Sequence, residues 1–181
     1  MIRVMRRTLR TAPGPLAVRG IVFFAAAAGL WIAAPAAFVS LRLLLPIALA
    51  ALFAALFPGG RVVGVTMTLI IVSWILSTLA FGEPAGIGRT FMTACALYLT
   101  HSAAALAAML PHDAIVDNQV IIRWAGRSAM VIVASAAVTG IVVLLATRFT
   151  PTTSTFAVVG GLGVVAAIVA VLAKAAGLRR R

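Results

Sequence analysis

Long apolar runs, broken by short segments with proline, glycine or charge, make up most of this chain. Each run is about 17–25 residues long, which is the length a helix needs to cross the hydrocarbon core of a bilayer. The pattern predicts membrane-spanning helices at residues 20–38, 41–57, 62–81, 89–110, 128–147 and 155–176. We therefore expect an all-α fold, a polytopic membrane helical bundle of about six transmembrane helices.

The breaks between these runs contain residues that end helices. "PGGR" precedes the third run, "GEPAGIG" the fourth, and Pro111 follows it. Proline lacks the N–H that a helix needs, and glycine tolerates turn geometry. Only "VSLR" separates the first two runs, which contain Pro35 and Pro46. These two runs could form a tight hairpin or a partly re-entrant pair.

Composition supports lipid as the solvent for most of the chain. Hydrophobic residues make up 64% of it and charged residues 10%, against about 45–50% and 25% in soluble domains. The net charge is +12, but the basic residues punctuate the apolar runs instead of forming one patch. That placement excludes nucleic acid as the expected partner and is typical of topology signals.

We expect a multi-pass protein of the bacterial plasma (inner) membrane, and the positions of the basic residues predict that both of its termini are cytoplasmic. With six spans, this orientation leaves only Arg42, Arg89 and Arg148 outside. The expected divisions are a basic N-terminal tail (1–19), a six-helix transmembrane domain (20–176) and a basic C-terminal tail (177–181). "TAPGP" (11–15) is expected to be a flexible link, and the first run is interpreted as a retained span and not a signal peptide.

The fourth run carries the most polar face. Tyr98, His101 and Ser102 share one side of a helix and could form a polar path or pocket. Alternatively, each hydroxyl bonds a neighbouring helix or its own backbone. In the third run, Ser73 and Ser77 are expected at an interhelical contact. His101 and His112 lie in one segment, so a bis-histidine haem site is excluded and no cofactor is expected.

The sequence "PHDAIVDNQVIIRWAGRS" (111–128) is the longest polar stretch between runs. Asp113 and Asp117 suit the start of a helix. We expect an interfacial amphipathic helix at about 117–127 that continues into the fifth run, with Trp124 at the headgroups and Arg123 and Arg127 reaching phosphates. A docking ridge for a partner, or a metal site at His112, Asp113 and Asp117, is an alternative.

Residues 101–127, around Asp113, Asp117, Arg123, Trp124 and Arg127, resemble small multispanning actinobacterial membrane proteins. Those include ones encoded near MoxR-type ATPases and DUF58-domain proteins. The resemblance covers no catalytic residues and implies an accessory role in the cell envelope.

No expected span carries Asp, Glu, Lys or Arg near its middle, and no catalytic constellation or metal ligand set is evident, so an enzyme is not expected. The leading hypothesis is a non-enzymatic accessory or scaffold subunit whose partners are membrane lipids and other membrane proteins. The alternative is a small transporter or a lipid- or quinone-handling protein that uses Tyr98, His101 and Ser102.

Overall fold

A computed structural model describes residues 13–110 and 118–148 of the chain, where all regular structure is helical. The helices are α2 (Pro13–Ala33), α3 (Leu41–Leu56), α4 (Arg61–Leu79), α5 (Ile87–Met109) and α6 (Asn118–Arg148), with a 3₁₀ turn η1 (Ala36–Phe38) before α3. The expected all-α class is confirmed. The predicted sixth span (155–176) and the tail at 177–181 lie outside the described residues.

Proline lies at the first described residue of α2 and just beyond its end. The helix begins at Pro13, seven residues before the predicted start at residue 20. Proline is well suited to a first helical turn, because the N–H it lacks would have no partner there. Part of the expected flexible link at 11–15 is therefore helical. The helix ends at Ala33, short of the predicted 38, because Pro35 disfavours helical backbone at the residue before it.

Four helices of the described part are long and apolar enough to cross a membrane, which indicates a membrane protein. These are Gly14–Ala33, Arg61–Leu79, Ile87–Met109 and Gln119–Leu144. By contrast, α3 has 16 residues and contains Pro46. At 1.5 Å per residue it is about 24 Å long, shorter than the hydrocarbon core of about 30 Å.

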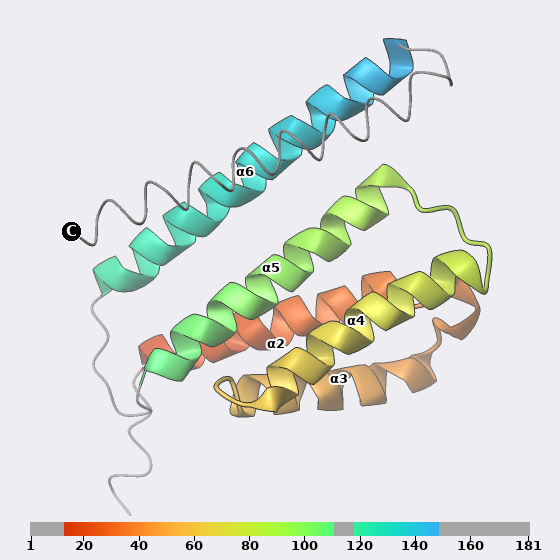
Figure 1. Cartoon of the computed structure of the whole chain (residues 1–181). Coiled ribbons are helices and arrows are strands. Elements are labelled where there is room, and N and C mark those ends of the chain that lie inside the picture. Colours follow the sequence, from red (N-terminus) through yellow and green to blue (C-terminus); the bar gives the residue numbers. More distant parts are fainter. Residues whose placement is uncertain (1–12, 111–117, 149–181) are drawn as a thin grey trace, which may run out of the picture. The chain divides into compact units, whose positions relative to one another are not determined.

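Helices α2 to α5 form an antiparallel bundle in which α2 is central (Figure 1). Helix α2 packs against α3, α4 and α5, most extensively against α5. Because α2 and α4 run in one direction and α3 and α5 in the other, the bundle has two distinct ends. We call them the Arg61 end, where α2 and α4 begin, and the Arg89 end, where α2 and α4 finish.

Small apolar side chains fill the interior of the bundle. One buried cluster joins Val18 and Val22 of α2 to alanines of α3 and α5 and to Val63 of α4. A second cluster, toward the Arg89 end, contains Leu30, Ala33, Ile47 and Ile70. Small residues let membrane helices approach closely, so that van der Waals packing can hold them together in lipid.

Helix α2 lies close to both α4 and α5 at Gly29. A Cβ atom added there would lie 2.8 Å from Cδ1 of Ile70 and 3.3 Å from Cβ of Ala96. A hydrogen atom is therefore the side chain that fits between α4 and α5 without displacing either. This contact fixes how deeply α2 sits against the two helices.

Helix α6 is continuous over 31 residues. It covers both the expected amphipathic segment (about 117–127) and the predicted fifth span (128–147). At 1.5 Å per residue, it measures about 46 Å, which exceeds the hydrocarbon thickness of about 30 Å. Roughly ten residues of this helix can therefore lie beyond the hydrocarbon core.

Candidate functional site

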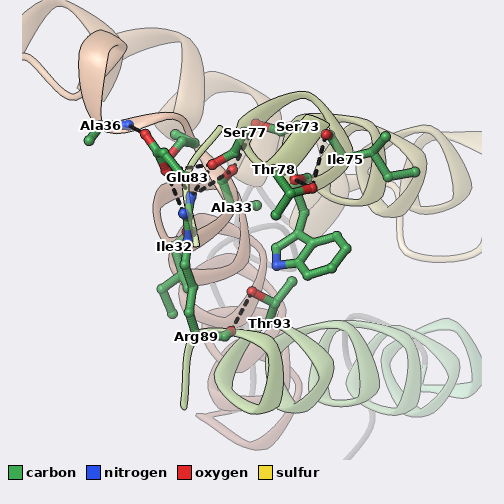
Figure 2. A network of polar contacts seen from close by, with 12 residues as sticks. Ile32, Ala33, Ala36, Ser73, Ile75, Ser77, Thr78, Glu83, Arg89 and Thr93 are labelled. Atoms are coloured by element: carbon green, nitrogen blue, oxygen red, sulfur yellow. Dashed lines mark hydrogen bonds and ion pairs between the residues drawn. The ribbon is translucent and has the colours of Figure 1, made fainter. Parts of the chain in front are cut away.

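The most highly connected polar cluster of the described residues lies at the Arg89 end of the bundle. It consists of Ser73 and Ser77 of α4, Glu83 of the α4–α5 loop and Arg89 of α5 (Figure 2). These side chains gather around the last turn of α2. The final carbonyl groups of a helix have no partner within that helix, and they carry the negative end of its dipole. Such an end attracts a cation and hydrogen-bond donors.

Arg89 supplies both. Its Nε donates to the carbonyl oxygen of Ile32 at 2.9 Å, and its Nη2 donates to that of Ala34 at 2.9 Å. Nη2 also donates to the Ser77 hydroxyl oxygen at 2.7 Å, and Nη1 to Oε2 of Glu83 at 2.5 Å. The planar guanidinium offers five N–H groups in a fixed fork, which suits it to several acceptors at once. Arg89 thus caps α2 from a neighbouring helix.

Glu83 balances the charge of Arg89 and adds a further connection. Its Oε2 accepts from the Ser77 hydroxyl at 2.5 Å, and its Oε1 accepts from the backbone N–H of Ala36 in η1. The hydrogen bond from Ser77, then that from Ala36, then that from Arg89 hold the pKa of Glu83 below its ordinary value. Glu83 is 18% exposed and Arg89 23%, so the ion pair is mostly shielded from solvent.

The chain folds back locally to bring Glu83 onto Ser77. Gly82 has φ +63°, a left-handed conformation that glycine adopts without the cost other residues meet. Beyond it, the backbone N–H of Glu83 donates to the carbonyl oxygen of Ser77 at 3.1 Å. The turn after α4 therefore positions the carboxylate before α5 begins.

The cluster is suited to holding helices together rather than to chemistry. Ser73 donates to the carbonyl oxygen of Ala33 at 3.3 Å, which adds a direct α4–α2 bond. This confirms the interhelical contact expected for Ser73. The Arg89 guanidinium and both carboxylate oxygens of Glu83 are engaged within the protein, so neither group is left as an open acid, base or anion site.

Six threonine hydroxyls of the described helices are bonded within their own helix. In each case the hydroxyl donates to the carbonyl oxygen four residues earlier, as in the buried Thr100, which donates to Ala96 at 2.7 Å. The same holds for Thr66, Thr68, Thr78, Thr93 and Thr139. Local bonding of this kind satisfies a hydroxyl without a partner helix or a ligand.

The residues expected to form a polar path on α5 differ in burial. His101 is exposed, while Tyr98 and Ser102 are half-buried. The hydroxyl oxygen of Ser102 is buried and has no hydrogen-bond partner among the described residues. The same is true of Nε1 of Trp74 on α4. Tyr98, His101 and Ser102 thus share a face, as the spacing requires, and no hydrogen bond joins them in the described part of the chain.

The polar stretch 111–128 is described only in its second half. His112, Asp113 and Asp117 lie outside the described residues. Arg123 is exposed and its Nη2 donates to Oε1 of Gln119 at 3.3 Å; Arg127 is exposed. Trp124 is half-buried and packs against the cluster that contains Val18 and Val63. Part of its ring therefore contacts protein, in addition to any headgroup contact.

Sequence reasoning missed the Glu83–Arg89 pair. It placed Arg89 on the outer side and assigned Glu83 and Arg89 no common role. The available signal was that Glu83 is the only glutamate of the chain and lies six residues before Arg89, across the break between two antiparallel spans. A lone acid and a nearby arginine at one helix junction predict an ion pair, although they do not predict the carbonyl groups that Arg89 caps.

The described residues contain no group of three or more His, Cys, Asp or Glu side chains able to hold a metal ion. No protein-family model, curated protein or solved structure matches the chain significantly.

Proposed function

We propose that the chain is a non-enzymatic accessory or scaffold subunit of a larger membrane complex in the bacterial cell envelope. In this proposal it crosses the plasma membrane six times, with both termini in the cytoplasm. The resemblance of residues 101–127 to small actinobacterial membrane proteins supports the envelope setting. Support for a scaffold comes from the use of the strongest polar groups, Arg89 and Glu83, to join helices.

The observation that carries the proposal is a pair of exposed small residues, one turn apart, on α4. Gly64 is exposed, and a Cβ atom added there would meet nothing within 4 Å. Thr68, one turn later, is also exposed and bonds back to the Gly64 carbonyl oxygen at 3.0 Å. Small residues four apart let a second membrane helix approach closely. Gly64 serves no packing within the described chain, so a helix of another subunit explains it best.

The test is co-purification of the full chain from native membranes in mild detergent. We expect a stoichiometric membrane partner with the wild type, and its loss with Gly64→Leu. Leu69→Ala changes an exposed residue of the same helix and serves as the matched control that keeps the partner. Recovery of wild-type monomer alone, or equal retention by Gly64→Leu, would contradict the proposal. Circular dichroism and thermal melting check that both variants fold.

The second candidate is a small transporter or a lipid- or quinone-handling protein. The observation that favours it is the buried hydroxyl oxygen of Ser102, which has no hydrogen-bond partner among the described residues, since buried polar groups normally have a partner. A substrate passing between Tyr98 and Ser102 would supply one. Ser102→Ala and His101→Ala should then reduce flux or bound quinone in reconstituted vesicles, and unchanged values for both would remove this candidate.

A further inference from the structure

The two ends of the bundle differ in how their arginines are neutralised. At the Arg89 end, Glu83 pairs with Arg89. At the Arg61 end, Arg19 of α2 and Arg61 of α4 form no ion pair in the described part of the chain. Arg61 is exposed at the first residue of α4, and Arg19 is half-buried in the second turn of α2. At the Arg89 end, only Arg42 among the described arginines of the bundle has no ion-pair partner, so unpaired positive charge is greater at the Arg61 end.

Helix α6 adds to the same surface. Ile121 and Trp124 pack against the buried cluster that contains Val18 and Val63. In the sequence, Val18 directly precedes Arg19, and Val63 follows Arg61 by two residues. Arg123 directly precedes Trp124, and Arg127 follows it by one helical turn; both are exposed. Arginines of three helices therefore flank, in sequence, residues that belong to or pack against one buried cluster.

Acidic residues of the chain are too few to neutralise this surface. Apart from Glu83, the chain has only Asp113 and Asp117, against the four arginines at this end. Arg3, Arg6, Arg7 and Arg10 precede α2 in the sequence and increase the excess. Guanidinium groups bind phosphate oxygens in a bidentate manner, and basic surfaces between membrane helices attract anionic lipid headgroups.

We propose that Arg19, Arg61, Arg123 and Arg127 form a binding surface for the phosphodiester headgroups of anionic phospholipids in the leaflet that the Arg61 end faces. The surface rests on the membrane placement of the bundle, and it does not depend on a protein partner. The half-buried Trp124 suits the boundary between acyl chains and headgroups. The long stem of Arg19 lets its charge reach the surface from a half-buried position.

The test uses the full chain in mixed nanodiscs of phosphatidylglycerol and phosphatidylcholine, released from the discs for native mass spectrometry of retained lipid. We expect wild type to retain phosphatidylglycerol over phosphatidylcholine beyond the ratio of the mixture. Arg61→Gln and Arg123→Gln should each lower this preference by roughly five-fold, because each arginine near the surface contributes comparably. Arg42 is an exposed arginine of α3 at the other end of the bundle, so Arg42→Gln should keep most of the preference for phosphatidylglycerol.

Equal retention of the two lipids by wild type would overturn the proposal, as would an equal loss with Arg42→Gln. Millimolar inorganic phosphate added before release should not displace the lipid; displacement would mean that the surface binds free phosphate instead. The experiment is independent of the scaffold proposal, because it uses the isolated chain. If the wild type shows no lipid preference but keeps a partner that depends on Gly64, only the lipid proposal is contradicted. If the wild type shows the lipid preference but has no such partner, only the scaffold proposal is contradicted.

Discussion

Arg89 lies with its Nη1 atom 2.5 Å from Oε2 of Glu83, while its Nε atom donates to the last turn of α2 at Ile32. One side chain therefore satisfies a carboxylate and caps a helix 57 residues away in sequence. Because the carboxylate also accepts from Ser77 and Ala36, loss of either charge leaves donors or acceptors of three helices without partners. The Glu83–Arg89 pair is the one ion pair found among the described residues.

Arg89→Gln should lower the stability of the bundle by about 2 kcal/mol or more, because it removes several hydrogen bonds to a charged group and leaves Glu83 without a counter-charge. Thermal unfolding of the full chain in nanodiscs measures the loss. Arg42→Gln is the matched control, since it removes an exposed arginine at the same end, and its melting temperature should stay near that of the wild type. Equal melting temperatures for both variants would argue against the capping role.

The pH dependence of stability should reflect the lowered pKa of Glu83. A carboxyl group whose pKa is lower in the folded state stabilises the fold above its unfolded pKa, near 4.3 for glutamate. That contribution is lost as the pH falls through the folded pKa. We therefore expect the wild type to lose melting temperature below about pH 4, as Glu83 becomes protonated and Ser77 and Arg89 lose their acceptor.

Glu83→Gln should be less stable than the wild type at neutral pH, and the difference between the two should narrow as the pH falls below about 4. Comparing the two proteins isolates the contribution of residue 83, because the rest of the chain is the same in both. A constant difference across this range would show that the charge of Glu83 contributes nothing to the fold.

Gly29→Ala should destabilise the bundle by about 1–3 kcal/mol, the usual range for an overpacked interior. The new Cβ would clash with Cδ1 of Ile70, which is the end of a flexible side chain. Ile70→Val removes that atom, so the double variant should recover part of the loss in a thermal unfolding assay. Gly64→Ala adds the same methyl group in open space and should be neutral or slightly stabilising. Additive losses in the double variant would exclude the proposed clash.

The helical class and most helix positions could be predicted from the sequence, because runs of apolar residues with proline and glycine at their breaks determine both. The start of α2 at Pro13 was missed because "TAPGP" is typical of a link, whereas proline in a first turn is compatible with a helix. The cap formed by Arg89 was also not predictable. It depends on where α2 ends in space relative to α5, which no spacing along the chain reveals.

Membrane topology can be mapped by cysteine accessibility, because Cys95 is the only native cysteine. In a Cys95→Ser background, we expect Arg42→Cys and Ala85→Cys to react with an impermeant maleimide added outside intact cells. Ile115→Cys should react only after the membrane is made permeable. This pattern is what the proposed topology requires, in which both termini are cytoplasmic and α3, with its 16 residues, crosses fully. If position 42 is protected while position 85 reacts, the α2–α3 pair would be re-entrant. Labelling of position 115 from outside would reverse the orientation, and the arginine surface at the Arg61 end would then face the outer leaflet.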